Sequence, residues 1–366
     1  MKILQIIDSL TTGGAEKLIL ETIPLLSQKG IQVDLLVLDG NEYPYMKQLK
    51  ALNCCTIFSL GKGSLFNPFY ILKIIPYLKK YDLLHVHLFP AQYWVILAKI
   101  ISFSKVKLVF TEHNTSNTRM QKSFFRIIDR NVYKFYDKVV CISKEVKQVL
   151  LEYVDFKSND LILIENGVNL NSINEALAID KKKMNHTIHE TDKLLIQVAG
   201  FRIQKDQKTV IRAMQYLQSN VKLLLVGDGA LRSECELLVS KLNLQERVFF
   251  LGVRTDVPSL LKTADVSVVS SHWEGFGLVA VEGMATGKPV IASDVPGLSN
   301  VVEGAGILFE RGNEKDLALK IQELLDNVFY YTEVAKAGLD RANEYDINIM
   351  VDKQIKLYRE LLNKYY

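Results

Sequence analysis

Residues 274–282 read EGFGLVAVE and carry two glutamates, Glu274 and Glu282, on either side of a glycine-rich turn. The segment before the turn, ADVSVVS at 264–270, is short, apolar and rich in β-branched residues, which predicts a buried strand. The segment after it, 278–286, has the pattern of a helix and ends at a glycine. We therefore expect the turn at the carboxyl end of a strand, where open α/β sheets bind their ligands.

The chemistry of this turn suits a ligand that carries both phosphates and sugar hydroxyls. Gly275 and Gly277 would let the backbone approach a ligand, and the amides of Gly277 and Leu278 would point at an anion. The glutamates suit hydroxyl groups better than phosphates, because a carboxylate accepts hydrogen bonds. A purely structural turn, with a glutamate that stabilises the helix dipole, is the alternative that this stretch leaves open.

The composition is that of a soluble globular chain with room for two domains. It has 366 residues, of which 48% are hydrophobic and 23% charged. The four cysteines have neither metal-ligand spacing nor the density of a disulfide framework, so we expect a reducing compartment. The first residues lack a signal-peptide pattern, and no apolar run reaches about 18 residues. These features predict a protein that is cytoplasmic or peripheral on the inner face of the cell membrane.

The positive charge gathers in the first half of the chain. Residues 1–170 carry 21 Lys and Arg against 15 Asp and Glu, whereas residues 171–366 carry 24 against 26. The excess is small and no nucleic-acid-binding module is recognisable, so we expect no nucleic-acid partner.

Two segments of this half combine basic and aromatic residues. The first has basic residues at helical spacing: Arg119, Lys122, Arg126 and Arg130. The second comprises Phe66, Phe69, Tyr70, Lys73, Tyr77, Lys79 and Lys80. Both fit contact with an anionic membrane surface, and a solvated helix face is the alternative.

Strands and helices alternate along the chain in two sets. The first set has strands at 2–7, 33–38, 82–87, 108–111, 139–143 and 162–165. A polar stretch at 171–192 predicts a linker. The second set has strands at 194–200, 223–229, 248–252, 264–270, 289–294 and 306–310. Such alternation predicts an α/β protein of two doubly wound parallel sheets, with domains at 1–170 and 171–345.

In this order, the motifs resemble the retaining glycosyltransferases of family 4, which have the GT-B fold of two Rossmann-like domains facing across a cleft. The most specific element is the pair Glu274 and Glu282 around Gly-Phe-Gly. The supporting elements are Gly13-Gly14-Ala15-Glu16, His113, Asn166-Gly167-Val168, Arg202 with Lys205, Gly227-Asp228-Gly229, and Gly252-Val253-Arg254 with Asp256. The resemblance covers essentially the whole chain and implies that the last helix, 346–366, packs back on the first domain.

The resemblance also implies which residues bind and react. A nucleotide-diphosphate sugar would occupy the second domain, and the acceptor the first. The implied catalytic residues are Glu274, Lys205, Arg202 and His113. The implied nucleotide-sugar-binding residues are Gly13, Gly14, Glu282, Gly275, Phe276, Gly277, Leu278, Val253 and Arg254.

Each implied role follows the chemistry of the side chain. Glu282 would hold the ribose diol, while Glu274 and the turn amides would hold the sugar. Lys205 and Arg202 would neutralise the diphosphate as it leaves. The base would lie against Val253 and Arg254. Gly14 would press against the phosphates and His113 would lie near the reacting carbon, although a lone histidine is also often structural.

One position departs from the family pattern. The family usually places its diphosphate arginine five residues before the lysine, and this chain has Gly200 there. Arg202, three residues before Lys205, lies on the same side of an extended chain as residue 200 and is expected to substitute. A solvated charge at a helix start is the alternative for both cations.

The resemblance implies transfer of a hexose or N-acetylhexosamine, from a UDP-sugar, to a glycan or lipid-linked acceptor in cell-surface polysaccharide biosynthesis. The anomeric configuration would be retained by a front-face displacement, with closure of the domains excluding water. We expect no metal ion and no cofactor, because the two cations supply the positive charge. A nucleotide-sugar epimerase of the same fold and a non-catalytic nucleotide-sugar-binding subunit remain alternatives.

Overall fold

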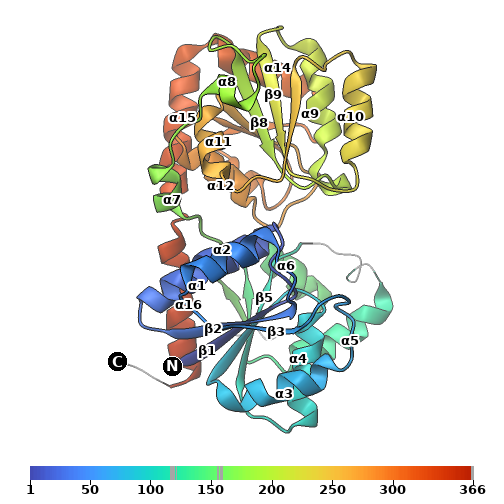
Figure 1. Ribbon diagram of the computed structural model, residues 1–366, viewed down its shortest axis with the longest axis vertical. Coiled ribbons are helices and arrows are strands. Elements are labelled where there is room, and N and C mark those ends of the chain that lie inside the picture. The colour runs from blue at the N-terminus through green and yellow to red at the C-terminus, as the bar shows by residue number, and fades with distance from the viewer. Residues whose placement is uncertain (116–119, 121, 155, 157–159, 364–366) are drawn as a thin grey trace. The chain divides into compact units, whose positions relative to one another are not determined.

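The computed structural model describes residues 1–115, 120, 122–154, 156 and 160–363. The chain divides into two compact units: unit 1 comprises Met1–Gly167 and Ile347–Tyr366, and unit 2 comprises Val168–Asp346. Each unit is built around one parallel β-sheet covered by helices (Figure 1). The two doubly wound parallel sheets predicted from the sequence are therefore confirmed.

The described part of unit 1 forms a seven-stranded sheet of order β3-β2-β1-β4-β5-β6-β7. Its strands are β1 (Lys2–Ile7), β2 (Gln32–Asp39), β3 (Ile57–Gly61), β4 (Leu83–His87), β5 (Lys107–Glu112), β6 (Lys138–Cys141) and β7 (Leu161–Leu163). Its helices are α1 (Gly14–Gln28), α2 (Pro44–Leu52), α3 (Tyr70–Lys80), α4 (Ala91–Ile101), α5 (Ser123–Tyr133), α6 (Lys144–Tyr153) and α16 (Ile347–Leu361). Helices α1, α2 and α16 cover one face of the sheet, and α3 and α4 cover the other (Figure 1).

Unit 2 has a six-stranded sheet of order β10-β9-β8-β11-β12-β13 in its described residues. Its strands are β8 (Lys193–Val198), β9 (Val221–Val226), β10 (Val248–Gly252), β11 (Val266–Val269), β12 (Val290–Ser293) and β13 (Ile307–Phe309). Its α-helices are α7 (Leu170–Glu175), α8 (Lys181–Met184), α9 (Gln207–Ala213), α10 (Arg232–Lys241), α11 (Val257–Thr263), α12 (Leu278–Ala285), α13 (Ser299–Val302), α14 (Glu314–Asp326) and α15 (Val328–Asn343). No sequence pattern described above predicts α15.

The strands of both sheets carry apolar residues on both of their faces. Residues 3–7 of β1 are all buried, and β11 is buried throughout. This pattern arises because helices cover both faces of a parallel sheet. No helix in the described part of the chain is both long and apolar enough to cross a membrane.

Residues 171–192, expected to be a linker, instead pack as part of unit 2. They contain α8 and most of α7. Ile173 and Ile188 are buried, and Ile188 belongs to a core cluster that includes Leu194 and Leu260. The sequence does not indicate this packing, because the few apolar side chains of the segment, among them Ile179 and Met184, leave no periodic pattern.

In both sheets the order of strand addition reverses next to the first strand. In unit 1, β2 and β3 lie on one side of β1, and β4 lies on the other. In unit 2, β9 and β10 lie on one side of β8, and β11 lies on the other. The carboxyl ends of the strands at such a switch point are where open α/β sheets bind ligands.

Asp8 follows β1 at the switch point of unit 1. It is buried, and its Oδ1 accepts a hydrogen bond from the Ala91 amide at 3.0 Å. Burial raises the pKa of the Asp8 carboxyl from 3.8 to about 7, the Ala91 hydrogen bond opposes this rise, and the charge of Glu16 adds to it. Because the folded state binds this proton more tightly than the unfolded state, the resulting stability is present at acid pH and is lost as the pH rises toward 7.

Asp8→Asn replaces the carboxyl by a neutral group of the same shape that can still accept the Ala91 hydrogen bond. Relative to the wild type, we expect the variant to gain up to about 4 kcal/mol of unfolding free energy as the pH rises from about 4 to about 8. Urea unfolding across this pH range measures the difference, with Asp340→Asn on the surface of α15 as the control. A difference that does not change with pH would contradict the raised pKa.

Candidate functional site

At the switch point of unit 2, Lys205 and Glu274 form an ion pair. Lys205 lies in the loop after β8 and Glu274 in the loop after β11, so neighbouring strands deliver the two groups. Ser271 Oγ donates a hydrogen bond to the same Glu274 carboxylate oxygen at 2.8 Å. Glu274 is only 8% exposed and Lys205 is half-buried, so the carboxylate is held largely out of solvent and the cation only in part.

Hydrogen bonds to the backbone fix the loop that carries Lys205. The Lys205 carbonyl accepts hydrogen bonds from Gln197 Nε2 at 2.8 Å and from Ser270 Oγ at 3.0 Å. Asp206 then caps α9, since its carboxylate accepts from the Thr209 amide and hydroxyl. Side chains from β8, from the end of β11 and from α9 thus hold Lys205 in place.

The Gly227-Asp228-Gly229 turn supports the same loop from the other side. A Cβ at Gly227 would lie 2.1 Å from the Ala199 carbonyl oxygen, and one at Gly229 would lie 2.6 Å from that of Phe201. Both glycines have positive φ, at 131° and 156°. Only glycine permits this conformation at such a close approach of two backbones, which explains the motif.

The glycine-rich turn starts α12 as predicted. Gly277 has a φ of 89° and is the N-cap of α12, and as a glycine it has no side chain with which to cap the helix. Glu282, in the second turn of the helix, is 4% exposed. The Phe276 ring is buried and packs edge-on against Tyr345 at 5.1 Å, so this residue can offer a ligand only its backbone.

Gly297 is a residue of this site that the sequence analysis missed. Its φ is 82°, and a Cβ there would lie 2.4 Å from the Glu274 carbonyl oxygen. The loop after β12 therefore presses directly on the backbone of Glu274. The Pro-Gly pair at 296–297 marks a turn in the sequence but says nothing about which backbone the turn approaches.

Arg202 is exposed beside the pair, and its guanidinium reaches back over Gly200. A Cβ at Gly200 would lie 3.7 Å from Arg202 Nε. Within the described residues, the Arg202 side chain makes no hydrogen bond or ion pair. The exposed positive charge of Arg202 therefore lies close to Gly200.

The Gly252-Val253-Arg254 turn follows β10. Val253 is 46% exposed. Arg254 Nε donates to Asp256 Oδ1 at 2.7 Å, and a second hydrogen bond joins the same two side chains. This bond to Arg254 lowers the pKa of the Asp256 carboxyl. The arginine is thereby held by the acid two residues later, and Val253 is the residue left to offer an apolar surface.

The remaining predicted residues lie in unit 1. Gly13 is the N-cap of α1, and a Cβ there would lie 2.2 Å from a Glu16 carboxylate oxygen. Glu16 also accepts a hydrogen bond from Thr11 Oγ1 at 2.8 Å. Gly14, the first residue of α1, is exposed. The Glu16 carboxylate therefore occupies the space beside Gly13 and is held there by Thr11.

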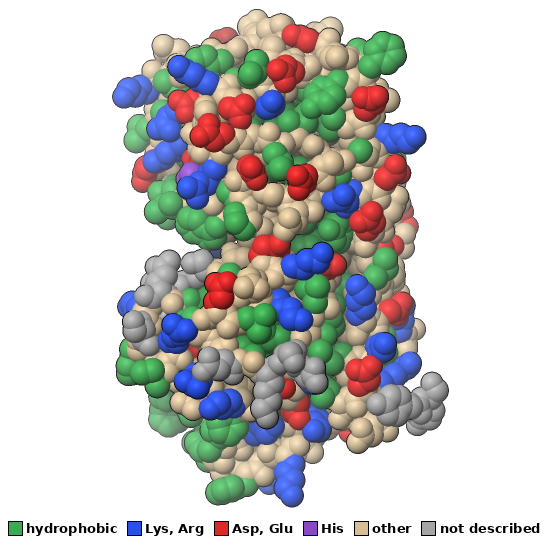
Figure 2. All heavy atoms as spheres, turned by 180° about the vertical axis from the view of Figure 1, so that it is seen from behind, with side chains coloured by type: hydrophobic (Ala, Val, Ile, Leu, Met, Phe, Trp, Pro, Cys, Tyr) green, Lys and Arg blue, Asp and Glu red, His purple; other side chains and the backbone are tan. Residues whose placement is uncertain are grey.

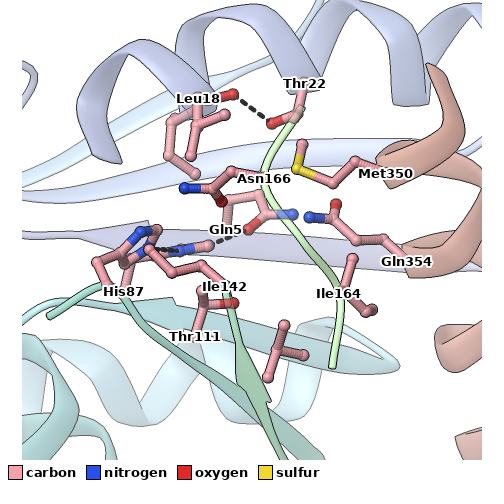
Figure 3. Close-up of a pocket in the computed structure, with 13 residues that line it drawn as sticks. Gln5, Leu18, Thr22, His87, Thr111, Ile142, Ile164, Asn166, Met350 and Gln354 are labelled. Carbon is pink, nitrogen blue, oxygen red and sulfur yellow. Dashed lines mark hydrogen bonds between the residues drawn. The ribbon is translucent and has the colours of Figure 1, made fainter. Parts of the chain in front are cut away.

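His113 lies just after β5 and contacts a second histidine, His87, at the end of β4. His113 Nε2 and His87 Nδ1 are 3.1 Å apart, and His87 Nε2 is 2.9 Å from Gln5 Oε1 in β1. Burial lowers the pKa of His113 to about 4 and that of His87 well below its usual range. Figure 3 shows His87 and Gln5 lining one side of a small cavity beneath α1 and α16.

His87 and Gln5 are not among the residues that the sequence motifs predicted. The available signal was the presence of three polar residues inside strands that otherwise read as apolar: Gln5 in KILQII, and His85 and His87 in LLHVH. Among the described residues, no group of three or more His, Cys, Asp or Glu side chains is arranged to hold a metal ion.

The comparisons with known proteins assign the family. Residues 178–340 match the family model "Glycosyl transferases group 1", and residues 12–172 match "Glycosyltransferase Family 4". An uncharacterized glycosyltransferase of Methanocaldococcus jannaschii is 31% identical over 311 residues, which are 82% of this chain and 82% of that protein. The chain belongs to the group 1, family 4 glycosyltransferases.

Two further comparisons cover nearly the whole glycosyltransferase. The first is N-acetylgalactosamine-N,N'-diacetylbacillosaminyl-diphospho-undecaprenol 4-alpha-N-acetylgalactosaminyltransferase of Campylobacter jejuni, 24% identical over 97% of this chain and 96% of that protein. The second is the crystal structure of Anabaena HepE in complex with UDP and glucose, with 21% identity and a TM-score of 0.86 over 99% of this chain and 100% of that one. The likeness to HepE shows a shared GT-B fold of two Rossmann-like domains.

The predicted residues of this glycosyltransferase fall into two groups. Unit 2 brings together Lys205, Glu274 and the glycine-rich turn, with Arg202 beside them. Glu282 lies further along α12, and Val253 and Arg254 lie after β10. Unit 1 holds Gly13, Gly14 and His113.

Two substitutions test whether Gly297 positions Glu274. Gly297→Ala must move the Glu274 backbone, so we expect it to lower the free energy of unfolding by about 3 kcal/mol or more. Gly304→Ala has a similar φ of 74° with nothing within 4 Å, and should lower it by only about 1–2 kcal/mol. Urea denaturation compares the two, and equal losses would show that the contact with Glu274 carries no strain.

Proposed function

We propose that this glycosyltransferase moves a hexose or N-acetylhexosamine from a UDP-sugar to a glycan or lipid-linked acceptor in cell-surface polysaccharide biosynthesis, with retention of anomeric configuration. The observation that carries the proposal is the partly buried Lys205–Glu274 pair at the switch point of unit 2, next to the start of α12 at Gly277. A cation, a carboxylate and free backbone amides are together the groups that a sugar diphosphate requires.

The comparisons support the substrate classes. The name of the Campylobacter relative specifies a diphospho-undecaprenol acceptor and an alpha linkage. The HepE structure contains UDP and glucose. We carry both chemistries over to this chain as a proposal: the donor is a UDP-sugar, and the acceptor is a lipid-linked or free glycan.

In unit 2, the donor diphosphate would lie by Lys205 and Arg202, whose positive charges stabilise the negative charge that develops on the leaving diphosphate. The exposed guanidinium of Arg202, close to Gly200, supports its substitution for the arginine that family members carry at that position. The two cations do electrostatically what a metal ion does in other transferases, so the proposed reaction is metal-independent.

The sugar would lie by Glu274 and the amides of Gly275, Phe276 and Gly277, with the ribose hydroxyls on Glu282 and the base against Val253 beside the Arg254 turn. Carboxylates suit these positions because each oxygen accepts a hydrogen bond from a hydroxyl. The buried Phe276 ring supports a role for its amide alone. The amides of Gly277 and Leu278, at the start of α12, would donate hydrogen bonds to an oxygen atom of the nucleotide sugar.

In unit 1, Gly13 and Gly14 would meet the phosphates at the start of α1, and His113 would lie near the reacting carbon. The proposed step is a front-face displacement. The bond between the sugar C1 and the diphosphate oxygen breaks, the bond between C1 and the acceptor oxygen forms, and the leaving diphosphate takes the proton of the acceptor hydroxyl. The acceptor oxygen attacks C1 on the same face that the diphosphate leaves, so the configuration at C1 is retained without a covalent enzyme intermediate.

Lys205→Ala and Glu274→Ala test this assignment. We expect each to lower kcat by about 10²–10³-fold, because each removes a charged group next to the leaving diphosphate or the sugar. Transfer from radiolabelled UDP-sugars to a diphospholipid-linked glycan measures the effect. Lys208→Ala, which removes a cation paired with Glu234 on the surface, is the matched control and should keep wild-type activity. Full activity in both site variants, or an epimerised sugar formed without acceptor, would reject the proposal.

A lipid-linked acceptor would lie in a membrane, so a surface of the protein that contacts the membrane is expected. Residues 43–128 contain twelve Lys and Arg but only two Asp and Glu. Five large apolar side chains of this region are 59–69% exposed: Phe66, Phe69, Leu72, Phe124 and Ile127. Together with Lys62 and Lys122 they form what we call the apolar-basic surface. Figure 2 shows basic side chains lying among hydrophobic ones on unit 1 as seen from behind.

Contacts within unit 1 join the two parts of this surface. The Phe66 ring packs on Phe89 at 5.8 Å, and Phe89 packs on Tyr93 at 5.1 Å. The Tyr93 hydroxyl donates to Asp129 of α5. The loop before α3 and helix α5 are therefore connected through the start of α4, which supports one continuous surface that an anionic bilayer would complement.

Several residues predicted for membrane contact have other roles. Arg126 donates to the carbonyl oxygens of Tyr153 and Glu152 at 2.8 and 2.9 Å, and so caps the end of α6. Tyr70 is buried, and Lys73 donates to the Leu60 carbonyl at 2.7 Å. Arg119 lies outside the described residues. Helical spacing pointed to Arg126 and composition to Tyr70 and Lys73, but neither shows which neighbouring backbone a long side chain reaches.

Sedimentation with liposomes tests the apolar-basic surface. We expect binding to phosphatidylglycerol liposomes at low salt, weaker binding at high salt, and none to phosphatidylcholine liposomes. Phe66→Glu with Phe69→Glu should lower the bound fraction about tenfold, because it replaces exposed apolar groups by like charges. Phe329→Glu is the matched control, since Phe329 is 86% exposed in unit 2. Equal binding by all three proteins would rule the surface out.

A further inference from the structure

Six side chains of unit 1 form one continuous chain of hydrogen bonds. In order they are His113, His87, Gln5, Tyr358, His85 and Thr111, and their successive donor–acceptor distances are 3.1, 2.9, 3.2, 2.6 and 2.6 Å. They come from strands β1, β4 and β5, the residue after β5, and helix α16. His113 is half-buried and every other member is fully buried, so each depends on its neighbours in the chain for hydrogen bonding.

The amide of Gln5 gives this chain a direction. An amide oxygen only accepts hydrogen bonds and an amide nitrogen only donates them. Gln5 Nε2 donates to the Tyr358 hydroxyl, which leaves Gln5 Oε1 facing His87 Nε2 at 2.9 Å. His87 Nε2 must therefore carry the proton of this hydrogen bond.

The direction passes on to His113. Burial holds the pKa of both histidines well below 7, so each ring carries one proton at neutral pH. Since the proton of His87 is on Nε2, its Nδ1 is a lone pair and accepts from His113 Nε2 at 3.1 Å. The proton of His113 is then on Nε2, and His113 Nδ1 is left as an acceptor.

We propose that Gln5 and His87 are positioning residues that fix the tautomer of His113, so that His113 Nδ1 accepts a hydrogen bond from a hydroxyl group of a bound sugar. The inference deepens the proposed function and rests on the role proposed there for His113. A histidine of the other tautomer would present an N–H donor at the same place and would oppose a hydroxyl that donates. The ring centroids of His87 and His113 are 5.4 Å apart, so the two rings are in direct contact.

The chain offers a matched control for Gln5. Gln354 of α16 lines the same cavity, and in Figure 3 it lies beside Gln5. Within the described residues, its side-chain amide makes no hydrogen bond to the protein. Replacing either glutamine by leucine removes one side-chain amide from the lining of this cavity. Only Gln5→Leu also removes the hydrogen-bond acceptor of His87.

The first experiment observes the tautomers directly. In the full-length protein labelled with ¹⁵N-histidine, the nitrogen chemical shifts distinguish Nδ1–H, Nε2–H and doubly protonated rings. We expect His113 and His87 both to be Nε2–H in the wild type and in Gln354→Leu, and His113 to become a mixture in Gln5→Leu. Single substitutions of each histidine assign the signals. An Nδ1–H tautomer of His113 in the wild type would overturn the proposal whatever the variants do.

The second experiment asks whether the tautomer matters for transfer. Gln5→Leu should lower kcat about tenfold with little change in the KM for the donor, because the donor diphosphate and base are bound elsewhere. Gln354→Leu should leave kcat unchanged, and melting temperatures of both variants check that they fold. Wild-type kcat and an unchanged His113 signal in a folded Gln5→Leu would overturn the proposal.

The two experiments separate this inference from the proposed function. If His113→Ala keeps full transfer, the role proposed for His113 fails, and the tautomer measurement still reports whether Gln5 directs the chain. If His113→Ala abolishes transfer while Gln5→Leu changes neither the tautomer nor kcat, the function stands and the positioning role fails.

Discussion

The ion pair between Lys205 and Glu274 depends on the parallel order of the sheet in unit 2. The two residues are 69 positions apart in the chain, and they meet because β8 and β11 are neighbours that end at the same edge. Removing a cation and a carboxylate from solvent costs free energy, so such a pair is stable only where the surrounding structure holds both groups in place. Hydrogen bonds from Gln197 and Ser270 to the Lys205 backbone, and from Ser271 to Glu274, supply that support.

Close contacts between loop backbones complete the same site. The turns at Gly227, Gly229 and Gly297 each bring a loop to within a distance at which a Cβ could not fit. Gly227 and Gly229 press on the loop after β8, and Gly297 presses on Glu274 itself. The glycines therefore act mainly by packing one loop against the next, and the geometry offered to a ligand is a consequence of that packing.

Unit 1 buries several polar side chains, and each of them must donate or accept a hydrogen bond within the protein. A buried histidine can donate or accept at either nitrogen, and its neighbours decide which. Here one amide, Gln5, has fixed donor and acceptor atoms and lies between His87 and the Tyr358 hydroxyl. The C-terminal helix α16 contributes Tyr358, so a residue of the first strand and a residue of the last helix belong to the same chain of hydrogen bonds as His113.

The sequence by itself determined the fold class, the family and most strands, because alternating apolar strands and helices leave periodic patterns and EGFGLVAVE is specific. It also indicated the charged and glycine residues of both units. Only the tertiary structure decided that residues 171–192 pack within unit 2 and that Arg126 caps α6. It also decided that Gly297 adjoins Glu274, and that Gln5 is linked to His113 through His87. These features depend on contacts between residues far apart in the chain, and local periodicity carries no information about which distant backbone or side chain a residue will meet.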